Sequence, residues 1–74
     1  MSDLKNQGLS LTVNGELRHV PPGSSVTALL AMIGLAERKV AVERNMEIVP
    51  RSEYATTQLA QDDAIEIVHF IGGG

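Results

Sequence analysis

The stretch LSLTVNGELRHV, residues 9–20, decides the fold. Residues 9–13 alternate apolar and polar side chains, which is typical of a strand with one buried face. Asn14-Gly15 follows and indicates a two-residue hairpin turn, because both central positions of such a turn require positive φ. Residues 16–20 are therefore predicted to return as a second strand. Pro21 ends this strand, since proline has no N–H to donate to a ladder.

The hairpin is followed by one predicted amphipathic helix. Ser24 and Ser25 are both suitable N-cap residues. Apolar side chains then recur at i, i+3, i+4 and i+7, namely Val26, Leu29, Leu30 and Ile33. Gly34 is suited to the C-terminal stop. We expect this helix to lie across the sheet with its apolar face inward.

The rest of the chain predicts short strands and turns. They comprise a strand beginning at 40–42, a turn at 45–47, a short strand at 48–49 that Pro50 ends, a helical turn within 51–61 with Tyr54 and Leu59 facing inward, a turn at Asp62-Asp63 and a last strand over 64–71. This order predicts the α+β class, with a mixed sheet and one main helix on one face. The β-grasp is the natural match.

Composition limits the function classes. The 74 residues include no cysteine, so a disulfide, a thiolate metal site and a side-chain persulfide are excluded. The net charge of −3 argues against nucleic acid or an anionic membrane as the main partner. Residues 1–8 contain no apolar run of the kind found in signal peptides, and we expect a cytoplasmic protein.

The sequence FIGGG, residues 70–74, carries the one distinctive reactive group, a carboxylate on Gly74. Glycine has no Cβ, so Gly72 and Gly73 would let the tail thread into a narrow active site. A carboxylate is a poor electrophile until ATP converts it to an acyl adenylate. We predict a flexible extension over 1–8, a single domain over 9–71 and a flexible tail over 72–74. The alternative is an inert terminus.

The last strand also predicts a docking surface. Ile65 and Ile67 share one parity and are expected to face the helix, whereas Val68 and Phe70 are expected on the opposite face. Exposed apolar residues beside a reactive tail suggest contact with a partner. Phe70 could instead fold back over the sheet edge. Arg51 could contact a partner or only cap the helical turn.

The histidines give no sign of a metal or catalytic site. His19 and His69 have no cysteine or carboxylate cluster at metal-ligand spacing, so we expect structural or surface roles and no metal.

Residues 9–74 resemble the ThiS family, the ubiquitin-like sulfur carriers of the thiamine pathway. The resemblance rests on Val49-Pro50-Arg51, Tyr54, the strand DAIEIV at 63–68 and the glycine tail. It implies that an adenylating, ThiF-like enzyme uses ATP to activate Gly74. A donor such as a cysteine desulfurase system then supplies sulfur, and thiazole synthase uses the resulting thiocarboxylate. The chain itself would be no enzyme and would bind no cofactor.

The chain departs from the family pattern at three places. Residues 1–8 extend beyond the usual start, and Met46 and Asp62 stand where the family commonly has glycine. The Met46 turn is therefore expected to be looser or of another type. Two other readings stay open, a molybdopterin-synthase-type sulfur carrier and a ubiquitin-like protein modifier. The Val-Pro-Arg segment favours the thiamine branch.

Overall fold

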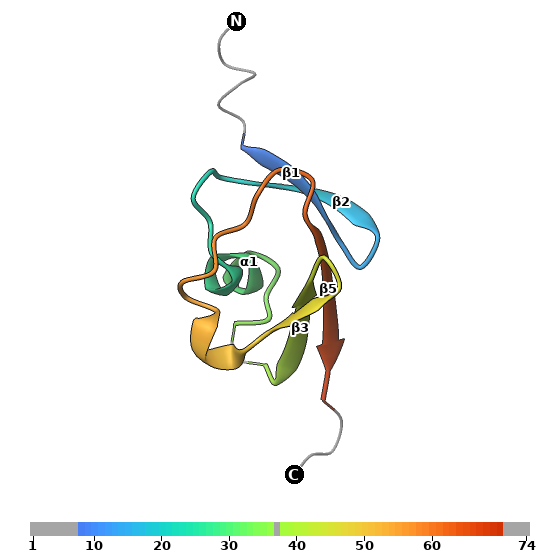
Figure 1. Ribbon diagram of the computed structural model, residues 1–74, viewed down its shortest axis with the longest axis vertical. Coiled ribbons are helices and arrows are strands. Elements are labelled where there is room, and N and C mark those ends of the chain that lie inside the picture. The colour runs from blue at the N-terminus through green and yellow to red at the C-terminus, as the bar shows by residue number, and fades with distance from the viewer. Residues whose placement is uncertain (1–7, 37, 71–74) are drawn as a thin grey trace, which may run out of the picture.

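The computed structural model describes residues 8–36 and 38–70, which form a five-stranded mixed sheet with one α-helix on one face (Figure 1). The elements are β1 (Leu9–Val13), β2 (Glu16–Val20), α1 (Val26–Met32), β3 (Val40–Arg44), β4 (Glu47–Val49), the 3-10 turn η2 (Arg51–Glu53) and β5 (Ala64–His69). The strand order is β2-β1-β5-β3-β4. This confirms the predicted α+β class and β-grasp arrangement.

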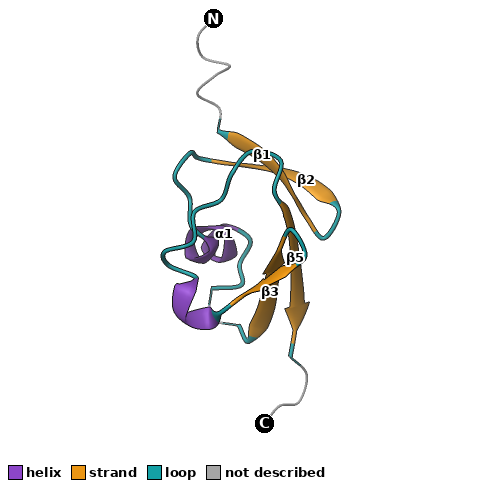
Figure 2. Ribbon diagram, in the orientation of Figure 1, coloured by secondary structure: helices purple, strands orange, loops and turns teal. Residues whose placement is uncertain are grey.

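The central strand β5 joins two hairpins into one sheet. It runs parallel to β1 and antiparallel to β3, so the first and last strands lie side by side. Figure 2 shows α1 and η2 on the same side of the strands. The opposite face of the sheet, called the open face below, carries no helix from the described part of the chain.

The opening hairpin forms as its sequence predicts. Val13 lies opposite Glu16, which leaves Asn14 and Gly15 as a two-residue turn. Their φ values are 52° and 86°, the left-handed geometry that this turn requires.

The two serines before α1 have different roles. Ser25 is the N-cap, and its Oγ accepts a hydrogen bond of 3.1 Å from the Ala28 N–H. The buried Ser24 instead donates from its Oγ to the Pro21 carbonyl at 2.7 Å. The helix therefore starts at Val26, and Ser24 closes the turn that leads into it.

Aliphatic side chains from both layers form the core. They are Leu11, Val13, Val20, Val26, Leu29, Leu30, Val40, Val42, Val49, Leu59, Ile65 and Ile67. The predicted helix stripe is confirmed, although Ile33 is only partly buried and packs against this cluster from the C-cap. Leu59 is buried and Tyr54 partly so, as predicted.

The side chain of Asn14 extends the sheet where β1 ends. Its backbone N–H donates to the Ile65 carbonyl at 2.8 Å. Its side-chain Oδ1 then accepts from the Ile67 N–H at 2.8 Å, and its Nδ2 donates to the Ile67 carbonyl at 3.2 Å. One amide thus satisfies both backbone groups of Ile67, in place of the next residue of a parallel strand. The sequence had indicated only a turn residue here.

The turn between β3 and β4 corrects two expectations. Asn45 and Met46 alone form it, because Arg44 lies opposite Glu47, so Glu47 belongs to the strand and not to the turn. The φ values of Asn45 and Met46 are 54° and 71°. Methionine therefore keeps the tight geometry in which both central residues have positive φ, and the expected looser turn was wrong. Asp62 likewise takes a left-handed φ of 69°.

Two details concern the ends of the described part of the chain. Gly8 belongs to the folded part, because a Cβ there would overlap the Val20 carbonyl. The last strand ends at His69 and not at residue 71. Residues 1–7 and 71–74, including Gly72, Gly73 and Gly74, lie outside the described residues. No helix among the described residues is long and apolar enough to cross a bilayer.

Candidate functional site

The C-terminal end of β5 leads directly to the glycine tail. Alternation along this strand buries Ile65 and Ile67 beneath α1 and turns Val68 to the open face, where 62% of its surface is exposed. Phe70 is 55% exposed, and its N–H still donates to the Lys39 carbonyl at 3.0 Å. Val68 therefore lies on the open face, as its parity predicts, and Phe70 is exposed just beyond the end of β5. Backbone hydrogen bonding to the segment that leads into β3 continues as far as Phe70, the last described residue.

A shallow apolar hollow of about 180 Å³ lies beside this exit. Arg51 and Phe70 both line it, together with Ile48, Pro50 and Tyr54. The remaining lining residues are Val40, Ala41, Val42 and Val49. The structure thus brings Arg51 and Phe70 together, although they lie 19 positions apart in the sequence.

The Val-Pro-Arg segment explains how Arg51 reaches this position. Val49 is buried at the end of β4, and Pro50 (φ −62°) stops the ladder and opens η2. The Tyr54 hydroxyl at the end of that turn donates to the Val40 carbonyl at 3.1 Å, which ties η2 to β3. Val68 joins the same surface because it lies opposite Ala41, a lining residue of the hollow.

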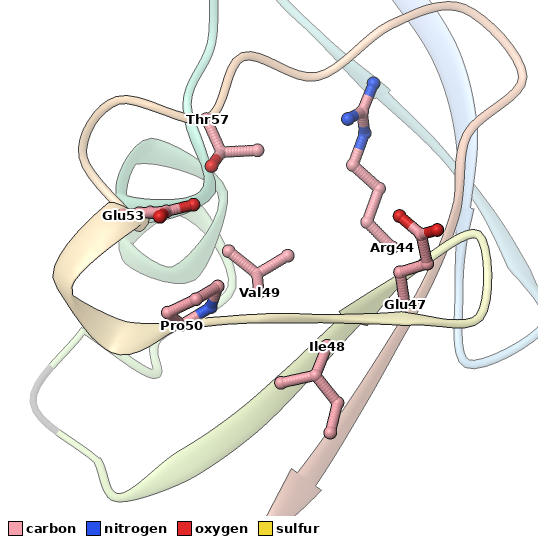
Figure 3. Close-up of a pocket in the computed structure, with 7 residues that line it drawn as sticks. All are labelled: Arg44, Glu47, Ile48, Val49, Pro50, Glu53 and Thr57. Atoms are coloured by element: carbon pink, nitrogen blue, oxygen red, sulfur yellow. The ribbon is translucent and has the colours of Figure 1, made fainter.

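A second, more polar hollow of about 150 Å³ lies between β4 and η2 (Figure 3). Arg44, Glu47, Glu53 and Thr57 supply its polar rim. Figure 3 shows Ile48 projecting from β4 to the opposite side from Val49. Ile48 is 73% exposed, so β4 contributes one more apolar side chain to the open face of the sheet.

The Asp63 carboxylate, only 5% exposed, holds the β3–β4 turn against the start of β5. It accepts hydrogen bonds from Arg44 Nε at 2.8 Å, Asn45 Nδ2 at 2.9 Å and the Ala60 N–H at 2.8 Å. Asn45 Oδ1 in turn accepts from the Ala64 N–H at 2.9 Å. The sequence had predicted only a turn at Asp62-Asp63, because the partners of Asp63 at the end of β3 and in the turn after it are 19 and 18 positions away.

These contacts set the charge state of Asp63. Burial by itself raises the pKa of the carboxyl group, but the hydrogen bonds from Arg44, Asn45 and Ala60 and the charge of Arg44 outweigh it. The pKa of Asp63 therefore lies below its ordinary value. The ionised carboxylate therefore stabilises the fold through these hydrogen bonds.

The two histidines lie apart and on the surface. His19 is on the outer strand β2 and His69 is at the end of β5, and both are exposed. Across residues 8–36 and 38–70, no group of three histidine, cysteine, aspartate or glutamate side chains is placed to hold a metal ion.

Comparisons with known proteins agree with this architecture. The model of the ThiS family matches residues 11–74. The sulfur carrier protein ThiS of Bacillus subtilis is 40% identical over 65 residues, which cover 86% of this chain and 98% of that protein. The crystal structure of the thiamine biosynthesis protein ThiS from Geobacter metallireducens superposes with a TM-score of 0.77. It is 36% identical and covers 89% of this chain and 100% of that one.

Two further relatives are longer proteins. Thiazole synthase of Paramagnetospirillum magneticum is 52% identical over 66 residues, and thiazole synthase of Magnetococcus marinus is 46% identical over 66 residues. Each match covers 89% of this chain but only 20% of the relative, so the chain spans about one fifth of their length. The family match over residues 11–74 and the similarity to the Bacillus carrier over nearly its whole length lead to one conclusion: this chain belongs to the ThiS family.

Proposed function

We propose that this chain is a sulfur carrier in thiamine biosynthesis and that Gly74 is the residue that carries sulfur. The match to the ThiS family through residue 74 carries this proposal, because it includes the glycine tail as well as the folded domain. The similarity to the Bacillus protein, which is named as a sulfur carrier, supports it. Since the chain has no cysteine, a side-chain thiol cannot hold the sulfur.

The chemistry proposed for Gly74 proceeds in two steps. A ThiF-like adenylating enzyme binds ATP, and a carboxylate oxygen of Gly74 attacks the α-phosphate and displaces pyrophosphate. The acyl adenylate then has a good leaving group. Hydrosulfide, which a thiol reductant releases from the persulfide of a donor such as a cysteine desulfurase system, attacks the carbonyl carbon and displaces AMP. The product is a thiocarboxylate on Gly74. In this scheme the partner supplies the ATP site, and the chain supplies the carboxylate and the surface by which it is held.

The surface around Arg51, Val68 and Phe70 is proposed to dock the chain on its partners. It lies next to the tail, it is apolar, and one cation stands at its edge. Aromatic and arginine side chains are enriched at the centres of protein interfaces. Threading Gly72 and Gly73 into an active site requires that the neighbouring surface be held in register, and this is the role that we propose for these three side chains.

Thiazole synthase is the partner proposed to consume the sulfur. Two proteins of that name contain a segment that is 52% and 46% identical to this chain. A segment joined to the synthase stays close to it, which is the arrangement expected for a carrier that delivers to that enzyme.

The intact mass of the chain tests the proposed function. We expect incubation with a ThiF-like enzyme, ATP and sulfide to replace one oxygen by sulfur, within the peptide that contains Gly74. A chain that ends at Gly73 keeps every described element and serves as the matched control. If the full chain shows no change while the enzyme modifies another carrier, the proposal fails. Stable adducts to lysine residues of other proteins would then favour a ubiquitin-like modifier.

The enzyme that takes the sulfur from the chain distinguishes the thiamine pathway from the molybdopterin pathway. Sulfur-loaded chain should lose its sulfur to thiazole synthase and its substrates. Loss to molybdopterin synthase instead would assign the chain to that second pathway.

Docking is tested by Phe70→Ala, with Leu17→Ala as the control. Leu17 is also exposed, at 65%, but lies on β2 at the far edge of the sheet. We expect Phe70→Ala to weaken binding to the adenylating enzyme roughly tenfold or more while the Tm changes little. A large loss of stability would show that Phe70 is a core residue, and equal binding by both variants would remove it from the interface.

A further inference from the structure

Two carboxylates face each other on the open side of the sheet. Glu43 of β3 lies directly opposite Glu66 of β5. Both have the parity that points away from α1, because their strand neighbours Val42 and Ile67 are buried beneath the helix. Like charges at directly opposed positions of an antiparallel pair destabilise a sheet. In residues 8–36 and 38–70, the ion pairs are Arg18–Glu16 and Arg44–Asp63, and neither involves Glu43 or Glu66.

Apolar side chains frame this pair on the same face. Ile48 of β4 lies opposite Glu43, so Ile48, Glu43 and Glu66 form one row across three strands. The next row toward the tail holds Ala41 and Val68, and Phe70 follows opposite Lys39. Four residues of strand separate Glu66 from Phe70, which is roughly 13 Å at about 3.3 Å per residue. One continuous surface therefore runs from the carboxylate pair to the exit of the tail.

Exposed apolar side chains gathered on one face are typical of a docking surface. Ile48, Val68 and Phe70 are 73%, 62% and 55% exposed. Covering the two carboxylates with an apolar surface alone would leave buried charges without partners, at a large cost. A cation placed between them removes both the mutual repulsion and that cost. The planar guanidinium of arginine has enough donors to bind two carboxylates at once.

We propose that this face binds a partner surface in which an arginine side chain, set among apolar side chains, inserts between Glu43 and Glu66. The inference rests on the proposed function in one respect, that the partner is thiazole synthase. The carboxylate pair then acts as a second attachment point, four residues before Phe70 on the same chain segment. It fixes the direction in which β5 presents the tail to the synthase.

Charge-neutral variants of the full chain test the proposal. The test variant is Glu43→Gln with Glu66→Gln. The matched control is Glu16→Gln with Glu53→Gln, which changes the net charge equally but lies on β2 and η2. Affinity for purified thiazole synthase is measured at about 50 mM and about 500 mM NaCl, since salt screens such pairs. The Tm of each variant is measured in parallel, as is loading of Gly74 with sulfur.

The test variant should bind about tenfold or more weakly than the wild type at low salt, and this difference should shrink at high salt. Its Tm should equal or exceed that of the wild type, because a repulsion has been removed. The control should bind within about twofold of the wild type.

Several results would overturn the proposal. They are equal binding by the test variant and the wild type, equal weakening by test and control, and a sulfur-loaded wild type that does not bind thiazole synthase. Sedimentation showing a dimer that the test variant abolishes, with binding to the synthase unchanged, would assign the face to a second copy of this chain. A wild type that takes no sulfur, yet binds the synthase through Glu43 and Glu66, would refute the proposed function but would still support the proposed docking surface.

Discussion

Replacing Asn14 by glycine isolates the contribution of its side chain to the sheet. Glycine accepts the φ of 52° at this position without strain, so the turn itself is kept. What is lost is the pair of hydrogen bonds to the Ile67 N–H and carbonyl, at 2.8 and 3.2 Å. Each such bond contributes about 0.5–1.5 kcal/mol net. We therefore expect Asn14→Gly to lower the free energy of unfolding by roughly 1–3 kcal/mol.

Urea unfolding followed by far-UV circular dichroism measures this change. The midpoint should fall while the slope of the free energy against urea stays constant, because the same surface is exposed on unfolding. For a domain of this size, 1 kcal/mol corresponds to a shift in Tm of about 4–8 °C.

Asn14→Asp separates the two hydrogen bonds of the side chain. Aspartate also tolerates positive φ, and its carboxylate still accepts from the Ile67 N–H. It cannot donate to the Ile67 carbonyl, so its loss of stability should fall between those of the wild type and the glycine variant. A glycine variant within about 0.5 kcal/mol of the wild type would mean that water replaces the amide. That result would refute the role of Asn14 in extending the sheet.

Three further substitutions test other parts of the fold. Met46→Gly should raise stability by roughly 0.5–1 kcal/mol, since it relieves a left-handed methionine, and an unchanged urea midpoint would show that no strain is present. Asp63→Asn should cost roughly 2–3 kcal/mol at pH 7 through its bond with Arg44. Because the pKa of Asp63 is lowered in the folded state, this stabilisation is present above the unfolded-state pKa and is lost as the pH falls through the folded-state pKa. The difference in unfolding free energy between wild type and variant should therefore close below about pH 4. A difference that stays constant with pH would contradict this role of Asp63. Gly8→Ala should destabilise the fold by about 1 kcal/mol or more, because its Cβ meets the Val20 carbonyl; equal Tm values would show that the chain shifts freely there.

The local elements could be predicted from the sequence because their signals are local. The alternation in residues 9–13, the turn at Asn14-Gly15 and the helical stripe from Val26 each depend on neighbours within one or two turns of the chain. The parity of β5 placed Val68 correctly on the open face for the same reason. The resemblance to the ThiS family, confirmed by the family match, joined these elements into a β-grasp.

The sequence predicted the backbone less well at Met46 and Gly8, where the local pattern allows more than one conformation. Met46 lacks the freedom of glycine, yet with a φ of 71° it completes a two-residue turn between the paired residues Arg44 and Glu47. Gly8 was assigned to the N-terminal extension, since nothing in its neighbours reveals its close approach to Val20.

By itself, the sequence determined the elements, their order, the apolar core face and the glycine-rich end of the chain. Only the tertiary structure decided which distant groups meet. Asn14 lies 53 positions from Ile67, and Asp63 lies 19 from Arg44. Arg51 and Phe70 share a hollow, and Glu43 faces Glu66, only because β5 lies between β1 and β3. Backbone preferences and periodicity act over a few residues, whereas these contacts depend on strand order and register, which the packing of the whole chain sets.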